Sequence, residues 1–209
     1  PSCGPSRSTL LTGKYGPYDN EALFMRAKYL KTTTENVTPT MPEWFRKNGY
    51  TTVSVGKISH NPGGLGGMDW NDPEIVEIPN AWDRNLMPVG EWEHPKGAMH
   101  GLANGEKRGK PAEMAVFQSA DEPQNKYPDD LIKNEGINQL EILSKDKKPF
   151  FLAIGLLKPH LPFGAPKKYY DIYKNITLPP ILSPEKPIGI STWSNSNEFM
   201  SYNRWGKNP

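Results

Sequence analysis

Hydrophobic and polar positions predict a helix followed by a strand within residues 40–56. Thr40 with Glu43 three residues later forms the capping-box pattern that is typical of a helix start. Gly49 suits the position just after a helix end. The β-rich run 50–55 then predicts a strand. A helix followed directly by a strand is half of an α/β unit, so an α/β fold is expected.

A second pair of elements is predicted within residues 128–154. Asp129 or Asp130 suits the N-cap of a helix. The apolar positions of that helix include Ile132, Ile137, Leu140 and Leu143. The continuous apolar run 150–154 is typical of a strand buried on both faces of a parallel sheet. Lys57 and His160 follow the two predicted strands, and ligands of open α/β sheets bind beyond the carboxyl ends of the strands.

The remaining segments show weaker patterns. Residues 6–13 predict a short helix, whereas residues 14–38 and the chain from residue 175 onward are expected to be irregular. Residues 61–127 are expected to form a loop-rich insertion with short strands around 74–78. Its tryptophans, Trp70, Trp82 and Trp92, could line a sugar-stacking wall, but packing of the insertion onto the body is the favoured interpretation.

Composition narrows the class of protein. The 209 residues include 19 glycines and 22 prolines with 35% hydrophobic residues, which predicts long connections around a modest core of one domain. A net charge of +2 without a Lys/Arg run argues against a nucleic-acid partner. No apolar stretch reaches membrane-spanning length. Because the chain begins inside the motif described next, we expect residues 1–209 to be part of one domain with both ends missing.

Three short stretches carry the candidate chemistry. The only cysteine, Cys3, lies in the polar, turn-forming run CGPSR, and this context favours a reactive thiol over a buried one. The stretches GKISH at 56–60 and KPH at 158–160 add cationic side chains. The candidate residues are Cys3, Arg7, Lys57, His60, Lys158 and His160. Cations around one cysteine suit a tetrahedral oxyanion such as sulfate or phosphate.

These stretches resemble the type I sulfatase family. PSCGPSRSTLLTG is similar to the first family signature, and GYTTVSVGKISH resembles the second, except that Ser59 stands where an aromatic residue is more usual. PFFLAIGLLKPHLPF most closely resembles the iduronate-2-sulfatase-like branch. The resemblance implies that a formylglycine-generating enzyme oxidises Cys3 to formylglycine, directed by Cys3, Pro5 and Arg7. The hydrate of that aldehyde is then the nucleophile.

The resemblance also implies a fold and roles for the other residues. The fold would be an alkaline-phosphatase-like α/β sandwich with a mostly parallel central sheet flanked by helices, incomplete in this chain. Arg7 would hold the hydrate, Lys57 would bind a sulfate oxygen, and His60 would assist proton removal. His160 would bind sulfate or act as general acid, while Lys158 either binds substrate or is simply solvated.

A divalent cation, usually calcium, is a further implication of the resemblance. The metal would be held by the formylglycine at position 3 and by carboxylates that lie outside residues 1–209, so the isolated chain is expected to be inactive. His94 and His100 lack a matching context and are expected at the surface.

Several functional alternatives remain open at this level. The predicted reaction is the removal of sulfate from a sulfated sugar or polysaccharide. A phosphate or phosphonate ester hydrolase of the same superfamily is one alternative, and a non-catalytic sugar-binding or degenerate paralogue is another. The predicted location is periplasmic or secreted.

Overall fold

A three-stranded parallel sheet forms the centre of the computed structural model, which describes residues 2–61, 76–121, 126–185, 188–189 and 197–204. The strands are β2 (Arg84–Leu86), β1 (Thr51–Gly56) and β4 (Phe150–Gly155), in that order across the sheet. β1 and β4 run in register from the pair Thr51–Phe150 to the pair Gly56–Gly155. Their carboxyl ends therefore meet at one edge, and the predicted α/β class with a parallel sheet is confirmed.

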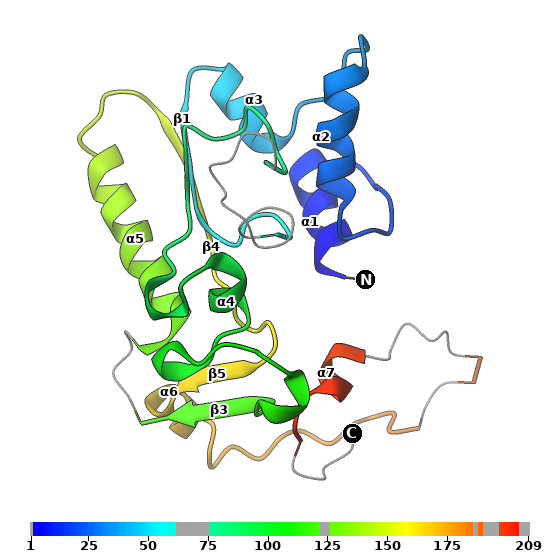
Figure 1. Ribbon diagram of the computed structural model, residues 1–209, viewed down its shortest axis with the longest axis vertical. Coiled ribbons are helices and arrows are strands. Elements are labelled where there is room, and N and C mark those ends of the chain that lie inside the picture. Colours follow the sequence, from blue (N-terminus) through cyan, green and yellow to red (C-terminus); the bar gives the residue numbers. More distant parts are fainter. Residues whose placement is uncertain (1, 62–75, 122–125, 186–187, 190–196, 205–209) are drawn as a thin grey trace.

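Helices cover the sheet on both sides. Figure 1 shows α5 (Pro128–Leu143) on one side of β1 and β4, and α1 (Cys3–Thr12), α2 (Ala22–Thr32) and α3 (Met41–Lys47) on the other. In α3 the predicted capping box is present, because Thr40 and Glu43 exchange side-chain and backbone hydrogen bonds. The main core lies between β1, α5 and α4 (Pro95–Met99); its buried residues are Val53, Val55, Trp92, Ala98, Met99, Ile132, Leu143 and Leu157.

A second, smaller layer lies beyond the carboxyl edge of the central sheet. β3 (Phe117–Ala120) and β5 (Phe163–Pro166) form a parallel pair, followed by α6 (Lys167–Asp171), with α7 (Asn197–Ser201) beside them (Figure 1). The single-turn helices η2 (Gly90–Trp92), η3 (Ala103–Gly105) and η4 (Pro111–Glu113) lie in the connection between β2 and β3. A separate apolar cluster joins these elements through Leu102, Met114, Val116, Leu161 and Tyr202.

Some segments that were expected to be irregular contain helices. Residues 14–38 contain α2, whose Leu23, Phe24 and Ala27 are buried, although no side chain caps its start. The chain after residue 175 contains α7, and Phe199 and Tyr202 pack onto the second core. Both helices are stabilised by tertiary packing more than by local signals, which explains why the sequence pattern did not predict them.

Other expectations about α5 and β4 also need correction. Tyr127 occupies the N-cap position of α5 without a capping side-chain hydrogen bond, and Pro128 lies in the first turn, so neither Asp129 nor Asp130 is the N-cap. Ile137 and Leu140 are about half exposed on α5. β4 is not buried on both faces, because Phe150 and Ile154 are exposed. Among the described strands β4 pairs only with β1, which leaves its other edge open.

Residues 61–127 do more than connect elements. The described part contributes β2 to the central sheet and β3 to the second sheet. Residues 76–78 of the expected strand around 74–78 have no regular structure, and the rest of that strand lies outside the described residues. Trp92 is buried and donates from Nε1 to the carbonyl of Leu102, and Trp82 stacks near Phe151, so both pack as the favoured interpretation predicted. Trp70 lies outside the described residues.

Within the described ranges, every helix is too short or too polar to cross a bilayer.

Candidate active site

Cys3 is the first residue of α1 and carries a free, exposed thiol. Its surroundings are fixed by Asn20, whose Oδ1 accepts hydrogen bonds from the Gly4 amide and the Ser2 hydroxyl, each at 3.2 Å. A Cβ at Gly4 would lie 2.3 Å from the Asn20 Cα, so only glycine allows this approach. The thiol is thus presented to solvent from a rigidly held helix start.

Arg7 connects the first motif to the second. Its Nη1 donates to the carbonyl oxygens of Lys57 and Ile58, at 2.5 and 2.9 Å. Burial lowers the pKa of the guanidinium, and the negative charges of Cys3 and Glu77 partly offset this effect. Arg7 therefore lies between the cysteine and the turn that follows β1.

Lys57 is a buried cation at the carboxyl end of β1. Only 1% of the residue is exposed, and its backbone amide donates to the Gly155 carbonyl at 2.7 Å. Within the described part of the chain, its ammonium makes no hydrogen bond. Burial lowers the Lys57 pKa, whereas a Cys3 thiolate would raise it. A lysine that is buried and whose ammonium has no hydrogen-bond partner among the described residues favours the binding of an anion beside it.

His60 and Glu77 lie around the turn after Lys57. His60 Nδ1 is buried and has no partner among the described residues, and burial, followed by the charge of Lys57, lowers the His60 pKa to about 4. The Glu77 carboxylate accepts from the Asn61 amide at 3.1 Å and from the Ser59 side chain. Burial raises the pKa of Glu77 to about 7. Ser59, the departure from the family pattern, thus has a partner in Glu77.

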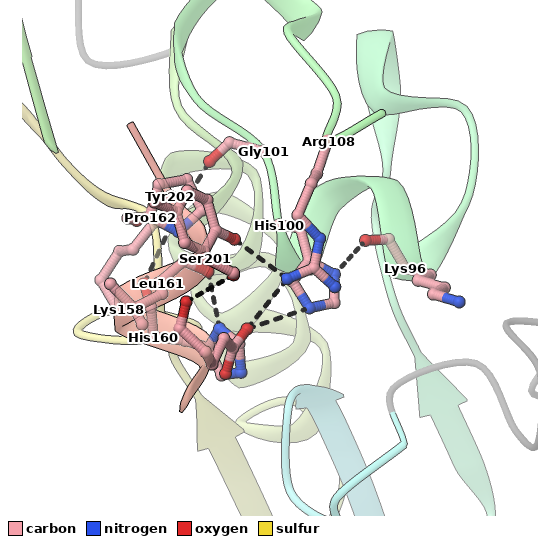
Figure 2. A network of polar contacts seen from close by, with 11 residues as sticks. Lys96, His100, Gly101, Arg108, Lys158, His160, Leu161, Pro162, Ser201 and Tyr202 are labelled. Atoms are coloured by element: carbon pink, nitrogen blue, oxygen red, sulfur yellow. Dashed lines mark hydrogen bonds and ion pairs between the residues drawn. The ribbon is translucent and has the colours of Figure 1, made fainter. Parts of the chain in front are cut away.

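The turn after β4 is held by Asp129 and Lys158. Asp129 accepts hydrogen bonds from the amides of Leu157 and Lys158, at 2.7 and 3.0 Å. Lys158 Nζ donates to the carbonyls of Gly101 and Pro162, at 3.2 and 2.6 Å, as Figure 2 shows. Burial lowers the Lys158 pKa to about 8. The ammonium of Lys158 therefore binds main-chain carbonyls and stabilises the turn that carries His160.

His160 lies against a second histidine. Its Nδ1 is 2.7 Å from the Leu161 carbonyl, and its ring centre is 5.1 Å from that of His100 (Figure 2). His100 is buried, with 5% exposure, so its expected surface position is wrong; the packing of α4 turns it inward. Burial lowers the pKa of both imidazoles, that of His100 to about 3. His94 is exposed, as expected.

The predicted residues form one electrostatic group. Cys3 affects the pKa of Arg7 and of Lys57, while Lys57 and His160 both lower the pKa of His60. Lys158 also lowers the pKa of His160. Residues that are distant in sequence are thus brought together at the carboxyl edge of the sheet.

Three residues near this group carried no signal in the sequence. They are Glu77, His100 and Glu198. None of the three lies within the motifs around Cys3, Lys57 and His160. Only the tertiary contacts of the described chain reveal them.

The described residues do not supply a calcium site. Within the described part of the chain, the one group of three or more His, Cys, Asp or Glu side chains placed to share a metal ion is His100, His160 and Glu198. Calcium prefers sets of six to eight oxygen ligands, and this group offers two ring nitrogens and one carboxylate. We therefore derive no catalytic step through calcium from these residues.

The fold and the site define an α/β domain with a cationic edge that suits an anion, and comparison with known proteins assigns its family. The model of the sulfatase family matches residues 1–180, and the chain belongs to that family. This assignment confirms the resemblance to the sulfatase family. The mostly parallel sheet flanked by helices, which the resemblance implied, is present in the described residues.

The chain is also similar to individual curated proteins and to a solved structure. The chain is 30% identical to iduronate 2-sulfatase of Homo sapiens over 210 residues, covering 97% of this chain and 34% of the relative. It is 30% identical to a sulfatase of Formosa agariphila over 229 residues, covering 100% of this chain and 40% of the relative. A solved phosphonate monoester hydrolase of Agrobacterium radiobacter is 19% identical, with a TM-score of 0.49 over 82% of this chain and 34% of that one. The chain spans about a third of the length of the iduronate 2-sulfatase relatives.

Proposed function

We propose that this chain forms part of the active site of a sulfuric ester hydrolase that removes sulfate from a sulfated sugar or polysaccharide. The observation that carries the proposal is the buried residue Lys57, whose ammonium has no hydrogen-bond partner among the described residues and whose pKa is raised by a Cys3 thiolate and lowered by Arg7. Membership of the sulfatase family supports the choice of sulfate as the anion.

In this proposal Cys3 is the site of modification. Formylglycine at position 3, made by a formylglycine-generating enzyme, would supply a hydrated aldehyde whose hydroxyl attacks sulfur. The exposed thiol at the start of α1 supports access for that enzyme. Arg7 lies one helical turn from position 3 and would orient the oxygens there through its guanidinium.

Lys57 would bind a non-bridging oxygen of the sulfate ester. Its burial strengthens the attraction between ammonium and anion, because little water screens it. The Arg7 contacts to the Lys57 and Ile58 carbonyls would keep the Lys57 main chain in place while the charge develops.

The two histidines would move protons. His60 has a lowered pKa and is neutral at pH 7, so its ring can accept a proton from the hydroxyl at position 3. His160 holds Nδ1 against the Leu161 carbonyl, which leaves Nε2 for the ester. An anionic ester raises the pKa of a nearby imidazole, and the protonated ring would then donate to the leaving oxygen as the S–O bond breaks.

Paired substrates test the proposal. Initial rates on an aryl sulfate and the matching aryl phosphate should be measured with the native protein and with Cys3→Ala, Lys57→Ala and Lys28→Ala, the last an exposed lysine on α2 as control. We expect faster turnover of the sulfate, no turnover in Cys3→Ala, and a loss of about 100-fold or more in Lys57→Ala. Faster phosphate turnover would favour the phosphate ester alternative, and full activity of Cys3→Ala would overturn the proposed nucleophile.

We also propose that the protein is exported to the periplasm or the cell exterior, where it would reach sulfated polysaccharides. Fractionation of the source cells with an antibody to the chain tests this; recovery in the cytosol alone would contradict it.

A further inference from the structure

We propose that His100, His160 and Glu198 form a binding site for a transition-metal ion of the zinc type, separate from any calcium site of the family. The three side chains come from the end of α4, the turn after β4, and α7. One ligand atom from each lies within 4.8 Å of the other two. Two histidines with one carboxylate form a ligand set that zinc uses in proteins, with a further position for water.

The hydrogen bonds of both histidines prepare them as ligands. His100 Nδ1 is 3.0 Å from the Lys96 carbonyl, and His160 Nδ1 is 2.7 Å from the Leu161 carbonyl (Figure 2). A carbonyl can only accept, so each Nδ1 carries the hydrogen and each Nε2 keeps its lone pair. This is the arrangement found around metal-ligating histidines, whose other ring nitrogen donates to a carbonyl or carboxylate.

Glu198 is also held in place. Its Oε1 accepts from Arg108 Nη1 at 2.9 Å and lies 3.9 Å from His100 Nε2. The same Nη1 donates to the Tyr202 hydroxyl at 3.0 Å, and Tyr202 is buried. Ligating carboxylates commonly keep such outer hydrogen bonds. The Glu198 side chain is 42% exposed while His100 is buried, so the site is open to solvent on one side only.

Neighbouring charges limit which metals this site can hold. Arg108 faces the carboxylate, Lys57 affects both histidines, and Lys158 affects His160. These cations oppose a divalent ion, and Glu198 offsets only part of their charge. Metals that bind imidazole strongly, such as Zn²⁺, Co²⁺ and Cu²⁺, are therefore favoured over Ca²⁺ and Mg²⁺.

One consequence rests on the proposed function. A metal on His160 Nε2 would withdraw that nitrogen from the sulfate ester, so Zn²⁺ should inhibit turnover reversibly. Metal binding itself does not require hydrolysis of a sulfate ester, so it can be measured in the absence of substrate.

Cobalt provides the direct test because Co²⁺ bound by nitrogen and oxygen ligands absorbs visible light. The native protein should be titrated with CoCl₂, then with ZnCl₂, alongside His100→Ala, Glu198→Gln and the control His94→Asn. The control keeps a cap on α4, because His94 caps this helix through Nδ1 and asparagine is a good N-cap residue. We expect one saturable Co²⁺ site in the native protein and in His94→Asn, displaced by Zn²⁺. We expect a loss of affinity of about tenfold or more in His100→Ala and Glu198→Gln.

The outcomes separate the two proposals. Equal cobalt spectra in His100→Ala, Glu198→Gln and the native protein, or no saturable spectrum, would overturn the metal site even if sulfate esters are hydrolysed. Because His100 is buried, its variant could unfold; Glu198→Gln changes an exposed residue and keeps the test decisive. A saturable site in a protein that hydrolyses no sulfate ester would support the metal site and count against the proposed function alone.

Discussion

Arg7 donates a hydrogen bond from Nη1 to the carbonyl oxygen of Lys57 at 2.5 Å, and so ties the helix that begins at Cys3 to the end of β1. The same nitrogen reaches the Ile58 carbonyl at 2.9 Å. Fifty residues of sequence separate the two motifs that this contact joins. The Arg7 guanidinium therefore helps to hold the first motif against the second.

Replacement of Arg7 tests this connection. Arg7→Lys shortens the side chain and removes the planar donor, so the two carbonyl contacts cannot both form. We expect the free energy of unfolding to fall by about 2 kcal/mol, the worth of a hydrogen bond from a charged group. Urea denaturation of the unmodified protein measures this. Ser6→Ala, at an exposed position on the same helix, is the control. An equal loss of unfolding free energy in both variants would contradict a stabilising role for the Arg7 hydrogen bonds.

Gly155 tests the packing beneath Lys57. A Cβ at Gly155 would lie 2.0 Å from the Lys57 carbonyl oxygen, so Gly155→Ala must displace β1 from β4 or shift the Lys57 main chain. We expect a loss of stability of about 2 kcal/mol or more, together with weaker binding of sulfate. At Gly109 a Cβ would have no neighbour within 4 Å, so Gly109→Ala is the matched control and should leave the midpoint of denaturation nearly unchanged. Equal midpoints for both variants would show that the strands do not approach this closely.

Glu77 should make stability depend on pH. Its folded pKa of about 7 exceeds its ordinary value of 4.5, so the folded state binds more protons between these values. Glu77 therefore makes its full contribution to the free energy of unfolding below pH 4.5, where it is protonated. This contribution is lost as the pH rises through 7. Gln stays neutral, so the stability of Glu77→Gln relative to the native protein should increase over this range. The increase is at most about 3.5 kcal/mol, at about 1.4 kcal/mol per pKa unit.

Urea denaturation at about pH 5 and about pH 8, on either side of the Glu77 pKa, measures this effect. Glu141→Gln, an exposed change on α5, controls for the loss of a surface carboxylate. If the difference in the free energy of unfolding between Glu77→Gln and the native protein were the same at both pH values, Glu77 would not titrate in this range.

Asp129 should position the turn that carries His160. Asp129→Asn replaces one acceptor oxygen with an amide donor that faces a backbone N–H, either of Leu157 or of Lys158. We expect a loss of about 1–3 kcal/mol in the free energy of unfolding, the cost of leaving a buried donor unpaired. Asp130→Asn removes only a pair with Lys133 near the surface and should cost less than about 0.5 kcal/mol. Comparable losses in both variants would contradict a special role for Asp129.

The sequence predicted the parts of this molecule that local chemistry determines. The capping box at Thr40, the strand after Gly49 and the strand at 150–155 each have signals within a few residues. The motifs around Cys3, Lys57 and His160 likewise lie on short stretches, and the order of the strands brought two of them to one edge.

The parts that depend on distant contacts were not predictable. α2 has no cap, and it forms because Leu23 and its neighbours are buried against other elements. His100 looked like a surface residue because nothing in its own segment indicates that α4 packs onto the turn at His160. The ammonium of Lys158 could not be assigned to the carbonyls of Gly101 and Pro162, since one of them lies 57 residues away.

A mass spectrum of the peptide that contains position 3 tests the proposed nucleophile most directly. The protein should be produced with and without a formylglycine-generating enzyme, and the two preparations compared. We expect an aldehyde at position 3 in the first preparation and a thiol in the second. An intact thiol in both preparations, with a known sulfatase converted in the same cells, would contradict the proposed nucleophile and with it the sulfatase mechanism.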